Sequence, residues 1–237
     1  MKYMWSKNRI AKYLLPIILK DRKEWQWYVE PFVWGANMID KVDGNRIWSD
    51  FNKYLACFLQ WLSKWKKYSE ITKEKYIDIK NKYQNESNNP YSLDLIWYAW
   101  ICASYSWKWF WWYAWKVETK WWLRNYQAEA IKNIEKQDLS NIIFKYSSYQ
   151  DLEIPDNSII YCDPPYESTT WYKDKFSHNE FFEWAREKKK EWHTIFISEY
   201  NAPDDFKCVW EKEVKSSLSA NWKSGGSKNS IEKLFTI

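Results

Sequence analysis

The fold is decided by residues 158–166, which read Ser-Ile-Ile-Tyr-Cys-Asp-Pro-Pro-Tyr. The apolar first half predicts a buried strand, and the two prolines end it because proline cannot donate to a strand ladder. The carboxylate, backbone carbonyls and aromatic ring that follow are the groups needed to hold a planar amine. Ligands of open α/β sheets bind beyond the carboxyl ends of the strands, where these groups would lie. A turn that merely terminates the strand is the alternative interpretation.

Strand and helix patterns alternate on both sides of this stretch, which predicts an α/β fold with a Rossmann-like core. The expected strands are residues 28–33, 45–47, 141–145, 159–162 and 194–198, with a closing antiparallel pair at 207–215 and 231–237. The expected helices are residues 6–19, 52–62, 72–83, 123–137 and 179–190. The helices before residue 139 and the polar loops between them predict a mostly helical inserted subdomain.

The chain has 237 residues, of which 28% are charged, and a net charge of +5. This length suits one core with an insertion better than two independent domains. Residues 61–139 hold thirteen Lys or Arg against nine Asp or Glu, so most of the excess lies in this third. Such a surplus suits an anionic partner such as nucleic acid, and it is equally compatible with an ordinary solvated surface.

Cysteine and histidine usage argues against a metal site or a disulfide framework. The four cysteines are scattered without a CxxC pair, and the chain has only two histidines, His178 and His193. A reducing cytoplasm is therefore the expected compartment. The amino terminus leads into a charged amphipathic stretch and does not resemble a signal peptide. The most apolar segment, residues 95–107, ends at Lys108, short of the roughly 20 residues that a membrane span requires.

Tryptophan and glycine are present in unusual numbers. The chain contains 21 Trp and 4 Gly, whereas an average chain of this length would contain roughly 17 Gly. Several Trp stand where the backbone favours glycine. Trp192 lies between a helix and a strand, Trp34 lies in a turn after a strand, and Trp222 lies in a polar turn. A left-handed or tight-turn backbone is sterically unfavourable for a residue with a large side chain.

We hypothesise that most of these Trp correspond to codons, UGA being the plausible one, that the source organism reads as glycine. Trp184 and Trp210 are among the better candidates for genuine tryptophan. The alternative is a truly Trp-rich protein that uses indoles for stacking or interface packing. The nucleotide sequence of the gene decides the question, because UGG codons at positions 5, 34, 192 and 222 would refute the hypothesis.

Five short segments follow one another along the chain: residues 3–7, 30–36, 49–52, 163–166 and 197–203. In this order and spacing the chain resembles the adenine-specific DNA methyltransferases of the class that includes the DNA adenine methylases of bacteria and phages. Trp repeatedly stands where that family carries Gly. The resemblance implies an S-adenosylmethionine-dependent methyltransferase core at residues 1–60 and 140–237. Residues 61–139 would then form an inserted DNA target-recognition subdomain.

The resemblance implies methyl transfer from S-adenosylmethionine to the exocyclic amino group of adenine in double-stranded DNA. The expected catalytic residues are those of the tetrapeptide, Asp163, Pro164, Pro165 and Tyr166. Asp163 and the Pro164 carbonyl would accept hydrogen bonds from the amine, and Tyr166 would stack on the ring. A stacked base cannot reach such a pocket, so base flipping is expected. Neither a metal nor a membrane is expected to take part.

The resemblance also implies the binding residues. The expected cofactor-binding residues are Tyr3, Lys7, Glu30, Pro31, Phe32, Gly35 and Asp50. Asp50 falls 20 residues after Glu30, as an acid that binds ribose hydroxyls commonly does, although an aspartate in this place can instead cap the next helix. The expected DNA-binding residues are Lys108, Lys116, Lys120 and Arg124, within the Trp-rich segment 97–122 whose aromatic and basic residues suit stacking and phosphate contact.

Two alternatives to this function stay open at the level of sequence. A non-catalytic nucleic-acid-binding protein could keep the fold with a degenerate cofactor site, and binding of S-adenosylmethionine separates it from the enzyme. An enzyme that methylates RNA or protein is the other alternative, although the aspartate at position 163 favours adenine. The sequence specifies neither the DNA recognition site nor a partner nuclease of a restriction-modification system.

Overall fold

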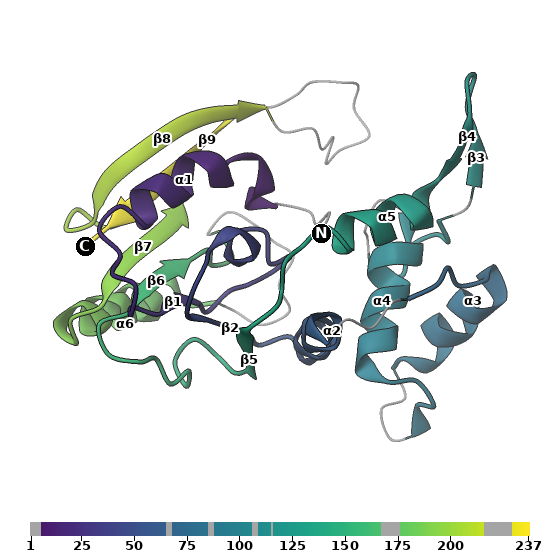
Figure 1. The fold of residues 1–237 in the computed structure, drawn as a ribbon, viewed down its shortest axis with the longest axis horizontal. Coiled ribbons are helices and arrows are strands. Elements are labelled where there is room, and N and C mark those ends of the chain that lie inside the picture. The colour runs from purple at the N-terminus through teal and green to yellow at the C-terminus, as the bar shows by residue number, and fades with distance from the viewer. Residues whose placement is uncertain are drawn as a thin grey trace.

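The structure, a computed structural model, describes residues 6–64, 68–84, 88–105, 109–114, 116–166, 176–215 and 229–237. A seven-stranded sheet in the order β5-β2-β1-β6-β7-β9-β8 forms its centre (Figure 1). The strands are β1 Tyr28–Glu30, β2 Arg46–Asp50, β5 Ile142–Tyr146, β6 Ile159–Cys162, β7 Thr194–Glu199, β8 Lys207–Lys215 and β9 Asn229–Thr236. The pairs from β5 to β7 are parallel, and β9 runs antiparallel to both β7 and β8. The predicted Rossmann-like α/β fold with a closing antiparallel pair is confirmed.

Helices cover both faces of this sheet. The described helices are η1 Lys7–Arg9, α1 Ala11–Ile18, η2 Ile39–Lys41, α2 Lys53–Ser63, α3 Lys73–Lys82, α4 Leu93–Ala103, α5 Tyr126–Ile134 and α6 His178–Lys190. Apolar side chains of α1 and α2 join one hydrophobic cluster, and those of α6 join a second. Tyr28 of β1 belongs to the first cluster and its neighbour Val29 to the second, because successive strand residues face opposite sides. The sheet is therefore buried on both faces at its centre.

The strand order reverses beside β1, which fixes the place of a ligand site. From β1 the chain builds β2 and then β5 on one side, and it later crosses over to build β6 on the other. In open α/β sheets ligands bind in the crevice at such a switch point, beyond the carboxyl ends of the strands. Two of the five family-like segments lie at this place: residues 30–36 begin with the last residue of β1, and residues 163–166 directly follow β6.

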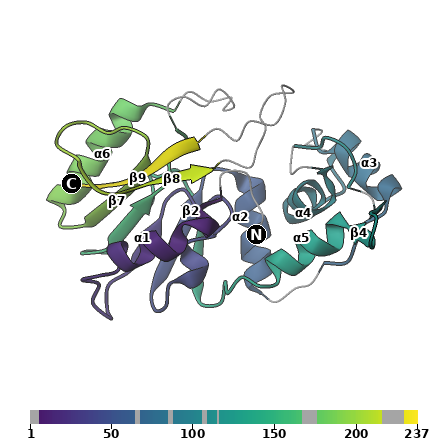
Figure 2. The same cartoon turned by 90° about the horizontal axis from the view of Figure 1, so that it is seen from above.

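The insertion lies to one side of the sheet, in both views of the molecule (Figures 1 and 2). It contains α3, α4, α5 and a hairpin formed by β3 Lys116–Glu118 and β4 Leu123–Asn125. Helix α2 packs against both α4 and β5, so it joins the insertion to the core. The boundaries of a recognition subdomain at residues 61 and 139 remain a proposal.

Two sequence-based expectations for the insertion are wrong. The helix predicted at residues 123–137 begins only at Tyr126, because Leu123–Asn125 pair with the strand Lys116–Glu118. The Trp-rich segment 97–122 is not uniformly a contact surface: Trp97 and Trp100 belong to α4 and are buried in the core. Trp111, Trp112, Trp121 and Trp122 are exposed.

The backbone geometry at two tryptophans is the geometry that glycine favours. Trp34 has φ 47° and Trp192 has φ 68°, both in the left-handed region. After α6 the amide of Trp192 donates to the Lys189 carbonyl, and the amide of His193 donates to the Lys188 carbonyl. This pair of bonds is the Schellman ending of a helix, whose left-handed C′ residue is usually glycine. The expected C′ position of Trp192 is thereby confirmed.

We expect Trp192→Gly to stabilise the protein. The side chain of Trp192 is 81% exposed, so its removal loses little packing. Relief of left-handed strain gains about 1–3 kcal/mol, and the extra freedom of glycine in the unfolded chain offsets about 0.4–1 kcal/mol, so the free energy of unfolding should rise by about 1 kcal/mol. Urea unfolding measures it. Trp25→Gly is the matched control, since Trp25 is exposed without a positive φ and glycine should not stabilise there.

Candidate active site

The tetrapeptide and the loop after β1 meet at the switch point. Asp163 directly follows β6 and is only 8% exposed. The indole Nε1 of Trp34, in the β1 loop, donates to the Asp163 carbonyl at 2.6 Å. The loop amide of Trp34 also lies 3.4 Å from a carboxylate oxygen of Asp50, at the end of β2. Three of the family-like segments are therefore brought together at the carboxyl edge of the sheet.

A buried charge cluster surrounds Asp163. Lys7, from η1, is 7% exposed, and its ammonium lies 3.3 Å from Asp163 Oδ1 and 2.8 Å from Glu232 Oε2. Lys7 also donates to the Tyr166 hydroxyl, which in turn donates to Glu232 Oε2 at 3.0 Å. Lys7 was expected among the cofactor residues, and its described polar contacts lie with the tetrapeptide and with Glu232.

Burial and charge set the protonation states in this cluster. Burial raises the pKa of Asp163 to about 6, against the lowering effect of the Lys7 charge and with a further raising effect of Glu232. Burial alone would lower the pKa of Lys7, but the charges of Asp163 and Glu232 outweigh it and raise that pKa. Burial also holds the pKa of Tyr166 well above its ordinary value. At neutral pH Asp163 is therefore ionised, Lys7 carries its ammonium charge and Tyr166 is a neutral phenol.

Contacts from β7 and α6 brace the rest of the tetrapeptide. The ring of Tyr166 packs edge-to-face on Tyr200, with centroids 4.6 Å apart and planes at 79°. His178 Nε2 donates to the Pro165 carbonyl at 2.9 Å and lies 3.6 Å from Glu199 Oε2. Pro164 is buried between Asp163 and Pro165. The turn is thus held from both sides, which fixes the direction of the Asp163 carboxyl group.

The loop after β1 combines a buried acid with a braced backbone. Glu30 is buried and accepts a hydrogen bond from the Tyr28 hydroxyl at 2.8 Å, and burial holds its pKa well above the ordinary value. A buried neutral acid of this kind would gain a favourable partner from an incoming ammonium group. Gln137 Nε2 donates to the carbonyls of Gly35 and Ala36 at 2.9 and 3.0 Å. Gln137 follows α5, so the end of the insertion fixes the shape of this loop.

Two further expected cofactor residues in this loop contribute to packing. Pro31 is buried, and the ring of Phe32 packs against the rings of Tyr149, Phe176 and Phe181 at centroid distances of 5.3 to 5.8 Å. The side chain of Phe32 therefore anchors the loop to the α6 side of the core.

Asp50 and an aromatic pair form the outer rim of the site. Asp50 accepts from the amide of Asn52 at 2.9 Å, and burial raises its pKa to about 6. The cap of α2 is Asn52, whose side chain accepts from the amides of Tyr54 and Leu55, so the alternative role of Asp50 as the helix cap is wrong. Phe51 directly follows β2, and Tyr146 is the last residue of the neighbouring strand β5. Both are exposed, and their rings stack with centroids 6.2 Å apart. They offer apolar faces beside an acceptor, as a nucleoside requires.

The chemistry of these side chains suits the parts of S-adenosylmethionine, and one residue does not fit it. Asp50 suits ribose hydroxyls, Glu30 suits the amino group of the methionine part, and the exposed rings suit the adenine. The exception is the indole of Trp34, which reaches from the turn to the Asp163 carbonyl and so occupies the space between the cofactor loop and the tetrapeptide. Glycine in this position would leave that space open.

The expected DNA-binding residues lie partly on the β3–β4 hairpin. Lys116 and Lys120 are exposed there, and Arg124 forms a bidentate ion pair with Glu129 at 2.7 and 2.9 Å. The hairpin projects from the insertion (Figure 1) and carries Trp121 and Trp122, which are among its exposed residues. Tyr3 and Lys108, expected at the cofactor and at DNA respectively, lie outside the described residues.

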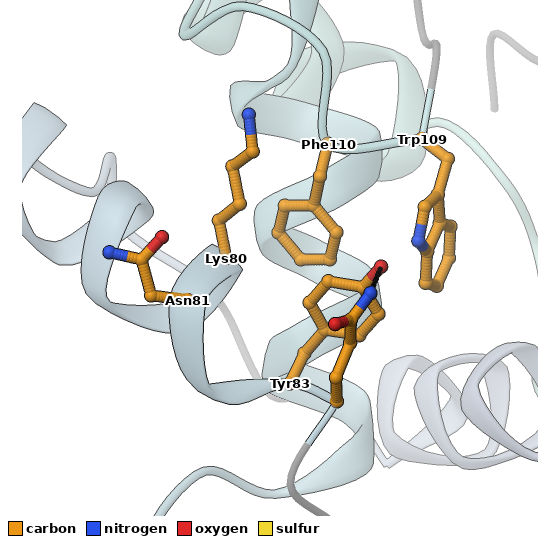
Figure 3. Close-up of a pocket in the computed structure, with 6 residues that line it drawn as sticks. Lys80, Asn81, Tyr83, Trp109 and Phe110 are labelled. Atoms are coloured by element: carbon orange, nitrogen blue, oxygen red, sulfur yellow. Dashed lines mark hydrogen bonds between the residues drawn. The ribbon is translucent and has the colours of Figure 1, made fainter.

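A cavity of about 540 Å³ lies within the insertion, at the carboxyl end of α3. Figure 3 shows Tyr83 facing Phe110, whose rings stack with centroids 4.7 Å apart, and Trp109 beside them. Its lining consists of Lys80, Asn81, Tyr83, Gln84, Trp109 and Phe110. It lacks the acidic groups that surround Asp163.

Neither a metal centre nor a membrane span is found in the described ranges. Their His, Cys, Asp and Glu residues form no group that could hold a metal ion. None of their helices has both the length and the apolar character that a membrane crossing requires.

Comparison with known families agrees with this geometry. The family model described as D12 class N6 adenine-specific DNA methyltransferase matches residues 3–216, which include the η1 segment, the β1 loop and the tetrapeptide. Among curated proteins, no sequence matches the chain significantly. The family match spans most of the 237 residues. The chain therefore belongs to the D12 class N6 adenine-specific DNA methyltransferase family, and it is a DNA-methylating enzyme.

Proposed function

We propose that this enzyme uses S-adenosylmethionine to methylate the N6 atom of an adenine that has been flipped out of double-stranded DNA. One observation carries the proposal. Asp163, whose carboxyl group is buried, lies at the switch point of the sheet, and its backbone carbonyl accepts a hydrogen bond from Trp34 in the β1 loop that would hold the methyl donor. Amine and methyl donor would then meet at a single place, and such positioning removes a large part of the barrier to a bimolecular transfer.

The tetrapeptide would act on the nucleophile. The lone pair of the adenine amine is delocalised into the ring, so the amine attacks poorly until its hydrogens are bound by acceptors. The ionised Asp163 carboxylate and the Pro164 carbonyl would accept those hydrogen bonds. Such acceptors stabilise the positive charge that develops on nitrogen during attack. Tyr166, whose phenol stays neutral, would pack its ring against the base.

The cofactor, when bound, would supply an electrophilic sulfonium methyl group. Asp50 would bind the ribose, Glu30 would bind the amino group of the methionine part, and the rings of Phe51 and Tyr146 would pack along the adenine. The backbone around Gly35 would contact the part of the cofactor that lies between its ribose and its amino group. Asp50 and Glu30 both have raised pKa values because of burial, and cationic or hydroxyl partners would stabilise their ionised forms.

The burial of Asp163 supports base flipping. A target base that stays stacked in a duplex cannot reach the carboxyl group of Asp163, whose side chain is 11% exposed. The projecting β3–β4 hairpin, with Lys116 and Lys120, would contact the DNA beside the flipped base. Its exposed basic side chains would neutralise phosphates.

A methylation assay tests the proposal as a whole. The protein is incubated with S-adenosylmethionine labelled in the methyl group and with duplex DNA of random sequence, and the DNA is digested to nucleosides. We expect label in N6-methyl-2′-deoxyadenosine. The absence of labelled product, with measured binding of DNA but not of S-adenosylmethionine, would instead identify a nucleic-acid-binding protein with a degenerate cofactor site. Parallel incubations replace the DNA with RNA or with protein, and label in those samples alone would contradict the assignment to DNA.

We expect the double variant Lys116→Gln/Lys120→Gln to bind DNA with a weaker dependence on salt. Each phosphate that a lysine neutralises contributes about 0.9 to the slope of log affinity against log salt, so the slope should fall in magnitude by about 2. Fluorescence anisotropy at several salt concentrations measures it. Lys189→Gln/Lys190→Gln is the matched control, because it removes the same charge from two exposed lysines outside the hairpin. These lysines end α6, where they interact with the helix dipole. An equal loss of slope in both pairs would contradict the role of the hairpin.

A further inference from the structure

Glu232 belongs to no family-like segment, yet it lies in the candidate active site. It is on β9, which runs antiparallel to β7 with Glu199 opposite Lys233. This register places Glu232 one residue beyond the carboxyl end of β7, at the sheet edge where the tetrapeptide lies. Its carboxylate binds Lys7 at 2.8 Å and accepts from the Tyr166 hydroxyl at 3.0 Å. Its side chain is 15% exposed.

The ammonium of Lys7 is shared unequally between two carboxylates. It lies closer to Glu232 than to Asp163, at 2.8 and 3.3 Å. A full ion pair with Asp163 would compete with the target amine for the same acceptor oxygens. The tighter contact with Glu232 therefore keeps the ammonium near Asp163, where its charge favours the ionised carboxylate, without saturating the carboxylate with hydrogen bonds.

We propose that Glu232 is a positioning residue of the methyl transfer: it holds the Lys7 ammonium and the Tyr166 hydroxyl so that the Asp163 carboxylate stays available to the adenine amine. The proposal rests on the function proposed above. Glu232 acts through Lys7 and Tyr166 and need not touch the base. When the amine arrives at Asp163, the ammonium keeps Glu232 as its partner, so the buried charge of Lys7 is never left unpaired.

The pH dependence of the reaction gives a readout that a purely structural residue would not move. Asp163 must be ionised to accept from the amine, so the rate should fall as the pH drops below its pKa of about 6. The groups that act on Asp163 are Lys7, Glu232 and Tyr166, and Asp163 in turn acts on Glu30, Tyr161 and Cys162. Of these, Lys7 lowers the pKa of Asp163 and Glu232 raises it.

The variant Glu232→Gln should change the rate and the pH profile together. Without the Glu232 charge, Lys7 should pair fully with Asp163, so the Asp163 carboxylate would no longer be free to accept from the adenine amine. This should lower kcat on the order of 10²-fold, with little change in KM for either substrate. Loss of the negative charge beside Asp163 should also shift the acidic limb of the profile to lower pH. Glu232→Asp, which keeps the charge, should leave that limb near its original position and stay closer to the parent in kcat.

The matched control is Glu213→Gln, on the adjacent strand β8. Glu213 is an exposed glutamate opposite Ile231, and its neutralisation makes the same change in net charge. It should leave kcat and the pH profile unchanged. Equal profiles for Glu232→Gln and the parent enzyme would overturn the proposal.

Carbon-13 NMR titration of the Asp163 carboxyl group provides a test that needs neither DNA nor cofactor. The pKa of Asp163 should be lower in Glu232→Gln than in the parent protein, and an unchanged value would overturn the proposal. The two hypotheses fail separately. A parent protein that does not methylate DNA contradicts the proposed function, whereas an active parent whose Glu232→Gln variant has normal kcat contradicts only the role of Glu232.

Discussion

Asp163→Ala should abolish DNA methylation and leave the protein folded. Removing one preorganised group that stabilises developing charge costs about 10²–10³-fold in kcat, and Asp163 also positions the amine, so the loss should reach at least the upper end of this range. The fold should survive because Lys7 keeps its closer partner Glu232 at 2.8 Å, so no buried ammonium is left without a counter-charge. Initial rates of N6-methyladenine formation and a urea unfolding curve measure the two effects.

Asp156→Ala is the matched control for this variant. Asp156 is exposed in the turn that precedes β6, only seven residues from Asp163, and carries the same charge. It should retain normal activity. If Asp163→Ala folds and methylates DNA at a near-normal rate, the catalytic role is contradicted. If Asp163→Ala does not fold, the same rate is measured in Asp163→Asn, which keeps the shape of the side chain.

The sequence predicted the centre of the fold because its signals there are local. β6 is a short apolar run that two prolines end, and every residue of it is buried. The left-handed positions of Trp34 and Trp192 were also expected, since each stands at a junction between two kinds of secondary structure. Both kinds of signal involve neighbours in the chain, and no knowledge of tertiary contacts is needed to recognise them.

Element ends that depend on distant partners were predicted less well. Residues 45–47 were expected to form a short strand, whereas β2 continues to Asp50, because Trp48 to Asp50 pair with Phe144 to Tyr146 of β5. The hairpin that shortens the predicted helix at 123–137 is formed in the same way, by pairing with Lys116–Glu118. Helix α4 is apolar on all sides, so periodicity gave no sign that Trp97 and Trp100 face the core.

The site residues that the sequence missed come from segments far from any motif. Gln137 donates to the loop carbonyls of Gly35 and Ala36, about a hundred residues earlier in the sequence. Glu232 binds Lys7, which lies 225 residues before it. Only the register of β9 and the course of the chain after α5 bring them there. The aromatic pair of Phe51 and Tyr146 left a usable signal, since both rings lie at the ends of neighbouring parallel strands.

Trp34→Gly should increase the affinity for S-adenosylmethionine by at least about 10-fold. Trp34 has φ 47°, a backbone conformation that costs a residue with a side chain about 1–3 kcal/mol, and its indole lies against the Asp163 carbonyl at 2.6 Å. A ligand that fills this space must displace the indole and break that hydrogen bond. Glycine removes both obstacles, and each 1.4 kcal/mol corresponds to a factor of ten in affinity. Isothermal titration calorimetry measures the change.

The control for this variant is Trp192→Gly, which makes the same replacement at the other left-handed tryptophan. Trp192 ends α6 and is exposed, so glycine there should raise the stability and leave the affinity for S-adenosylmethionine unchanged. A gain at Trp34 and none at Trp192 would show that the indole obstructs the cofactor site, as expected if these positions encode glycine. Equal affinities in Trp34→Gly and the parent would contradict the obstruction, and UGG codons at both positions would refute the recoding.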